Sequence, residues 1–90
     1  MVNGNDEREA ALPLFRVIAE RVGTIHELER RGGPVRETLN KLRRGGAMRG
    51  DSVRRLAMAL GLTFAEARAL VDETTSAVRA ARLRDEGASS

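Results

Sequence analysis

The chain has 90 residues, a formal net charge of +3, 41% hydrophobic residues and no cysteine. A chain of this length can bury one small core but cannot also enclose a deep substrate cleft, which argues against an enzyme. Disulfides and thiolate metal sites are excluded, and the lack of a long apolar stretch or a signal-peptide pattern leads us to expect a cytoplasmic protein.

The first expected helix follows a polar segment, residues 1–11, which we interpret as a disordered tail. Pro13 suits the first turn of a helix, where its missing N–H is not needed. Apolar residues then recur at helical spacing, at Leu14, Phe15, Ile18, Ala19 and Val22. Gly23 ends this helix, and Thr24 with Glu27 forms a capping box that predicts the start of the next one.

The third expected helix, about residues 34–44, follows a turn made by Gly32 and Gly33. Pro34 would be its first-turn residue. Helical spacing predicts a core face formed by Val35, Leu39 and Leu42. The remaining side chains would face outward, namely Arg36, Glu37, Asn40, Lys41 and Arg44.

The fourth expected helix begins after Gly45 and Gly46, with Asp51 or Ser52 as its N-cap. Its predicted core face consists of Val53, Leu56, Ala57 and Leu60. Gly61 would close this helix. Two methionines, Met48 and Met58, are expected to fill the core or pack against loops.

The last helix is predicted to start with a second capping box, Thr63 with Glu66, and to continue to about Leu83. Its apolar positions are Phe64, Ala67, Leu70, Val71, Thr74, Val78 and Ala81. Such a helix either folds against its own domain or contacts a second copy of the chain, in which case the candidate contacts are Leu70, Val71 and Val78. We expect a solvated face at Arg68, Arg79, Arg82 and Arg84, followed by a disordered end.

Positive charge is concentrated in one part of the chain. Residues 12–50 hold nine Arg or Lys against four Glu, a net charge of +5, whereas residues 1–11 sum to −2 and residues 72–90 to −1. A basic patch of this kind attracts phosphates. There is no Trp or Tyr, and both Phe residues occupy apolar positions, which argues against base stacking on single strands or RNA loops. These features favour duplex DNA as the partner.

A capped helix, a glycine turn and a second helix with a basic outer face are typical of a helix-turn-helix. Over about residues 12–71, the chain resembles the lambda-repressor-like (Cro/XRE) class of phage and bacterial DNA-binding domains. Three features carry the resemblance: the Thr-x-x-Glu-Leu opening at Thr24 with Gly33 in the turn, Leu39 and Leu42 followed by Arg44-Gly45, and the run from Val53 to Thr63. Residues 72–90 would extend the fifth helix and end in the tail.

The resemblance implies an all-α bundle of five helices that places residues 34–44 in the major groove of DNA. By position, the expected base contacts are Val35, Arg36, Glu37, Asn40 and Lys41, and the expected phosphate contacts are Arg43, Arg44 and Arg49. The family usually has a small alanine at the position of Glu29, so this carboxylate is expected to reach solvent or to pair with Arg30 or another basic side chain. The implied protein is a nucleoid-associated homodimer that binds repeated half-sites.

Other chemistry has little support in the sequence. His26 is the only histidine and has no cysteine partner, so we expect no metal site, catalytic group or cofactor, and no small-molecule substrate. Two functional classes remain. The first is a sequence-specific transcriptional regulator; the second is a protein-interaction module on the same fold, such as an antitoxin or adaptor, which docks its last helix on a partner and binds DNA weakly.

Overall fold

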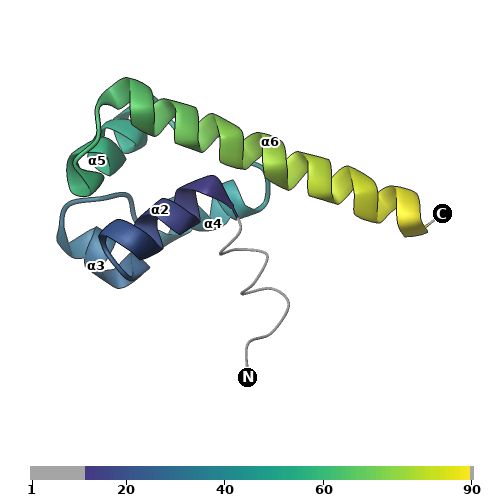
Figure 1. Ribbon diagram of the computed structural model, residues 1–90, viewed down its shortest axis with the longest axis horizontal. Coiled ribbons are helices and arrows are strands. Elements are labelled where there is room, and N and C mark those ends of the chain that lie inside the picture. The colour runs from purple at the N-terminus through teal and green to yellow at the C-terminus, as the bar shows by residue number, and fades with distance from the viewer. Residues whose placement is uncertain (1–11, 90) are drawn as a thin grey trace.

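The computed structural model describes residues 12–89, with side chains described to Arg84. This part of the chain is all-α, as predicted, and contains no strand. It forms a compact bundle of α2 (Pro13–Arg21), α3 (Ile25–Arg30), α4 (Arg36–Arg43), α5 (Gly50–Leu60) and α6 (Phe64–Ser89) (Figure 1). The expected N-terminal tail lies outside the described residues, as do the side chains of residues 85–90.

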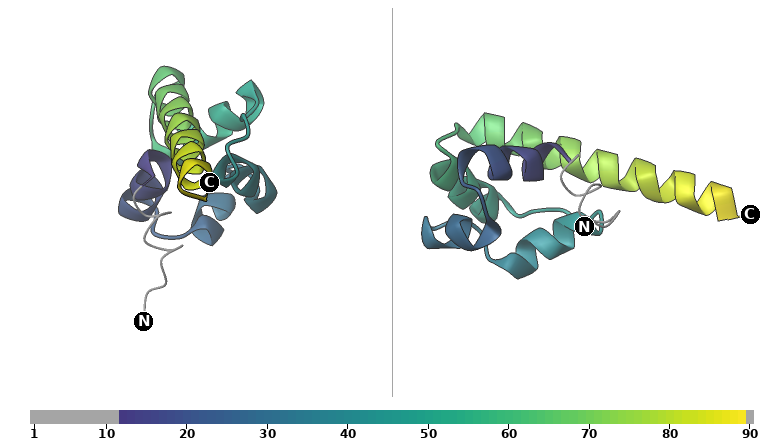
Figure 2. Two further views of the ribbon diagram at one scale, coloured as in Figure 1. Left: turned by 90° about the vertical axis from the view of Figure 1, so that its right-hand side faces the viewer. Right: turned by 60° about the horizontal axis from the view of Figure 1, so that its bottom comes forward.

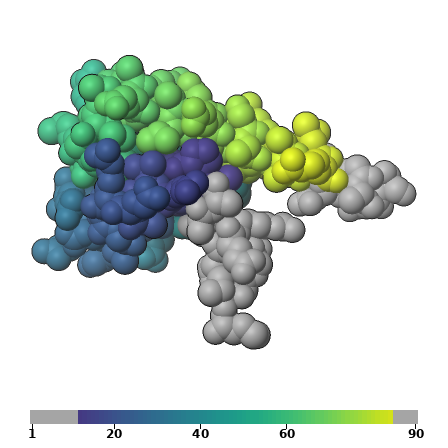
Figure 3. Space-filling model, viewed as in Figure 1, coloured from purple at the N-terminus to yellow at the C-terminus, as the bar shows by residue number. Residues whose placement is uncertain are grey.

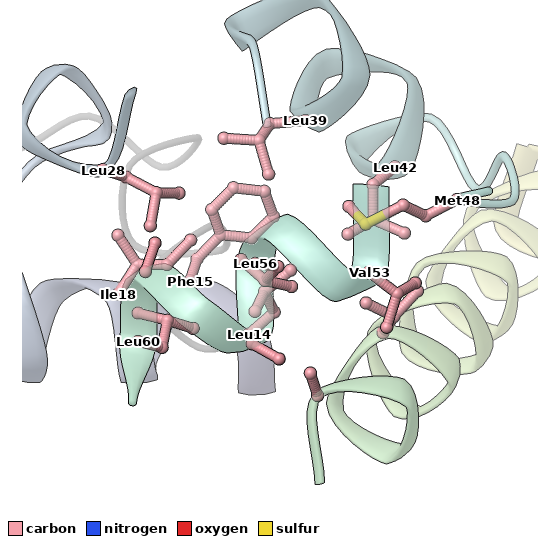
Figure 4. Packing of buried hydrophobic residues seen from close by; sticks show 14 residues of the cluster. Leu14, Phe15, Ile18, Leu28, Leu39, Leu42, Met48, Val53, Leu56 and Leu60 are labelled. Atoms are coloured by element: carbon pink, nitrogen blue, oxygen red, sulfur yellow. The ribbon is translucent and has the colours of Figure 1, made fainter. Parts of the chain in front are cut away.

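The core draws apolar side chains from all five of these helices (Figure 4). Phe15 lies near its centre, between Leu28 of α3 and Leu39 of α4. The predicted core positions that are buried include Leu14, Ile18, Leu42, Met48, Val53, Leu56, Leu60, Ala67 and Val71. Four predicted apolar positions, Ala19, Val35, Met58 and Phe64, are instead exposed, so helical periodicity overestimated the width of the apolar faces.

The helix ends confirm some local predictions and contradict others. Gly61 has φ +72°, the left-handed conformation that ends α5. Both bonds of the following capping box form: Glu66 N–H donates to Thr63 Oγ1 at 3.1 Å, and Thr63 N–H donates to Glu66 Oε1 at 3.0 Å. The predicted cap at residues 51–52 is wrong, because α5 begins at Gly50 with Arg49 at the N-cap position and no side-chain cap.

A buried hydroxyl joins the first and last described helices. Thr74 is fully buried, and its Oγ1 accepts from Leu14 N–H at 3.0 Å and donates to Leu70 O at 2.7 Å. The Leu14 amide is one of the donors that the first turn of a helix leaves without a partner. Thr74 therefore caps α2 from a position 60 residues away in the chain.

α6 is much longer than the other helices and projects beyond them (Figure 1, Figure 2, right view, and Figure 3). Its first half packs on α2, α4 and α5 through residues that include Ala67 and Val71. The helix continues past Leu83, where the sequence predicted its end, and reaches Ser89. The Leu83 side chain is 69% exposed on this projecting part.

Candidate nucleic-acid interface

The capping box predicted at the start of α3 forms only one of its two hydrogen bonds. Thr24 Oγ1 accepts from Glu27 N–H at 3.1 Å, as expected for the N-cap residue. The Glu27 carboxylate does not return this bond but forms ion pairs with Arg30 at 3.2 Å and Arg31 at 3.4 Å. The two cations compete with the Thr24 amide for the carboxylate, so α3 has a single-sided cap.

The turn between α3 and α4 depends on two glycines with different roles. Gly32 has φ +87°, a left-handed conformation that side chains disfavour. Gly33 has an ordinary φ, but a Cβ there would lie 2.8 Å from both Cγ and the carbonyl oxygen of Leu28. Its N–H donates to the Leu28 carbonyl at 2.9 Å. The first glycine therefore reverses the chain, and the second lets it pass close to α3.

α4 begins two residues later than predicted. Pro34 is buried in the turn, and Val35 is the N-cap with an extended backbone, φ −70° and ψ 159°. Glu29 explains how this start is stabilised, because its Oε1 accepts from the Arg36 amide at 2.9 Å. This differs from the expectation that Glu29 reaches solvent or pairs with a basic side chain. A carboxylate at the start of a helix is also favoured by the helix dipole.

The outer face of α4 carries most of the side chains that the sequence assigned to DNA. Val35 is 53% exposed, and the other exposed residues are Arg36, Glu37, Lys41 and Arg44, with Arg49 beyond the helix. Ion pairs among the described residues hold Arg16, Arg30, Arg31 and Arg68. No carboxylate of this part of the chain forms an ion pair with the exposed cations of this face, which are Arg36, Lys41, Arg44 and Arg49. Their charges are therefore available to an anionic partner.

Asn40 and Arg43 are placed differently from the rest of the predicted set. Both are half-buried, and Arg43 Nη1 donates to Asn40 Oδ1 at 2.5 Å. The Arg43 guanidinium also lies over the Phe15 ring of α2, with its Cζ 5.0 Å from the ring centroid. A base contact by Asn40 or a phosphate contact by Arg43 would require this cluster to rearrange.

The C-terminal end of α4 is held by α6, which the sequence did not predict. Arg82 Nη1 donates to the Arg44 carbonyl at 2.6 Å, and Arg79 Nε donates to the Gly45 carbonyl at 3.1 Å. Longer contacts of 3.4 Å join Thr75 to the Gly46 carbonyl and Arg68 to the Met48 carbonyl. The predicted solvated face of α6 is therefore, at Arg68, Arg79 and Arg82, a set of donors to the loop that follows α4.

The proposed dimer contacts on α6 are used within the chain. Val71 is 2% exposed and Val78 is 7% exposed, while Leu70 is partly buried against the core. Val71 and Val78 therefore have little surface left for a second chain, whereas Leu70 keeps part of its surface accessible. A partner of α6 would mainly contact other residues, such as those on its projecting part.

No helix among residues 12–89 combines the length and hydrophobicity needed to cross a membrane. The same residues contain no group of three or more His, Asp or Glu side chains placed to hold a metal ion. Comparisons with protein-family models, with curated proteins and with solved structures give no match. The geometry of the α3–α4 unit and its charged surroundings are therefore the features that point to a function.

Proposed function

We propose that this protein is a transcriptional regulator that binds double-stranded DNA and places α4 in the major groove. The observation that carries the proposal is the outer face of α4, where Arg36, Lys41 and Arg44 are exposed without carboxylate partners among the described residues. A major groove accommodates one α-helix, and its base edges can be distinguished by side chains of this kind.

The residues of the α4 face suit different parts of the duplex. Arg36 can donate two hydrogen bonds to guanine O6 and N7, Glu37 can accept from cytosine N4, and Val35 can contact a thymine methyl group. Arg44 and Arg49 suit phosphates. Arg49 is next to the uncapped amides at the start of α5, which provide further donors to the same anion.

A second candidate is a protein-interaction module, such as an antitoxin or adaptor. The projecting part of α6 favours it, because Leu83 is exposed on a helix that extends beyond the bundle. A second copy of the chain could also bind there and produce a dimeric regulator with two half-sites. In the interaction module, substitutions on the outer face of α4 would have no effect on partner binding.

The experiment that tests the proposal is selection of bound sequences from a random duplex pool at two salt concentrations. We expect enrichment of a motif, and we expect Arg36→Ala to lose about 1–3 kcal/mol of discrimination at one base position. Arg44→Ala should instead weaken binding to preferred and random duplexes alike. Binding without enrichment that is lost steeply with salt would indicate phosphate attraction alone and would contradict base contacts by α4.

A further inference from the structure

Two arginines of α6 bond to the chain directly after the C-terminal end of α4. The C-terminal end of a helix carries the negative end of its dipole, which a nearby cation offsets. Here the carbonyls of Arg44 and Gly45 each accept a hydrogen bond from a guanidinium, that of Arg82 in the first case and that of Arg79 in the second. Two cationic groups of α6 thus lie next to the negative end of the α4 dipole.

Both guanidinium groups keep donors for a further partner. Arg79 and Arg82 are exposed, and each guanidinium has five N–H donors, of which the bond to a carbonyl uses one. Arg44 is also exposed and directly follows α4, in the loop whose carbonyls these two arginines contact. Lys41 is one turn earlier, on α4 itself. None of these cations pairs with a carboxylate of the described residues.

We propose that Arg79 and Arg82, together with Arg44, bind the phosphate backbone of the duplex that α4 contacts, and so extend the DNA interface from α4 onto α6. The inference rests on the proposed function. It goes beyond that function because α6 becomes part of the DNA-binding surface rather than a helix used only for packing or for a protein partner. The phosphate backbone suits these residues because the exposed guanidinium groups of Arg79 and Arg82 lie next to the segment that follows α4, where the exposed Arg44 also lies.

The test is the salt dependence of affinity for the duplex selected above, measured for the full chain between 50 and 200 mM salt. Each phosphate contact contributes about 0.9 to the slope of log K against log salt. Arg82→Gln should therefore lower the slope by about 0.9, which means that the wild type loses roughly 3-fold more affinity than the variant over this range. Preferred and random duplexes should be affected equally. Arg82→Lys, which keeps the charge, should retain the slope.

Two control variants separate a phosphate contact from other roles. Arg84→Gln removes the same charge from the same helix, two residues further on, where no contact with the α4 end is made. It should leave the slope unchanged, and an equal decrease in both Gln variants would overturn the proposal in favour of general charge attraction. Thr75→Val removes a bond to the same loop without changing charge. If Arg82→Gln weakens binding as this variant does, with an unchanged slope, Arg82 only positions the loop and the proposal fails.

The outcomes also distinguish this inference from the proposed function. A wild type that enriches a motif, with an Arg82→Gln variant of unchanged affinity and slope, would refute the α6 contact and leave base contacts by α4 intact. A wild type that binds no duplex would refute both. Binding of an acidic polypeptide through Arg79 and Arg82 in that case would identify the surface as a protein-binding one.

Discussion

The substitution Gly33→Ala tests the close approach of α3 and α4, on which the orientation of α4 depends. A Cβ at this position would lie 2.8 Å from Cγ and from the carbonyl oxygen of Leu28. The first atom belongs to a fully buried side chain and the second to the backbone, so neither can move away without disturbing the core or the hydrogen bond from Gly33 N–H. Overpacking of this kind typically costs about 1–3 kcal/mol.

Gly50→Ala provides a matched control, because it is the same chemical change at a position with open space. Nothing lies within 4 Å of a Cβ there, and the φ of Gly50 is not positive. Since Ala restricts the unfolded chain more than Gly does, this variant should gain about 0.4–1 kcal/mol. We expect thermal and urea unfolding to show opposite changes for the two variants, with the melting temperature of Gly33→Ala reduced by at least about 4 °C.

A Gly33→Ala variant as stable as the wild type would contradict the close approach of α3 and α4 at this turn. It would mean that the turn has room for a methyl group beside Leu28. If the Gly33→Ala variant is destabilised but folded, its affinity for the selected duplex should also fall, because α4 must shift to accommodate the new methyl group. A variant that loses stability but keeps full DNA affinity would show that the turn does not orient α4 for binding.

Three other predictions concern single bonds. Thr74→Val should lower the free energy of unfolding in urea by about 1–3 kcal/mol, because the buried Leu14 amide loses its acceptor. Thr74→Ser should keep this hydrogen bond and so protect the Leu14 amide from hydrogen exchange. Glu29→Gln should strengthen DNA binding in a titration, because it keeps an acceptor for the Arg36 amide but removes a negative charge near the duplex; weaker binding would contradict this. The pKa of Glu66 is lowered, mainly by the backbone hydrogen bond at the N-cap of α6. The stability that Glu66 contributes should therefore be present above its unfolded-state pKa and disappear as the pH falls through its lower folded-state pKa. Glu66→Gln should abolish this dependence in unfolding experiments at several acidic pH values.

Local sequence patterns predicted the all-α class and much of the outer face of α4. Apolar spacing placed Leu39 and Leu42 in the core, which leaves Arg36 and Lys41 exposed. Positive φ at Gly32 and the two-sided cap before α6 were also predictable, because these features depend on residues within one turn of each other. The spacing of apolar residues could not predict the residue at which α4 begins, because that spacing does not show that a carboxylate of α3 caps α4.

Local sequence patterns suffice to predict which segments form helices and most of their apolar positions, because 3.6-residue periodicity and capping act over a few neighbouring positions. The groups that satisfy the ends of those helices, however, are distant in the chain and come together only when the helices pack. Thr74 caps α2 across 60 residues, and Arg82 reaches the end of α4 across 38. The packing of α6 also buried Val78 within its own domain and brought its arginines to the α4 loop. These contacts follow from how the helices cross, which periodicity within one helix does not specify.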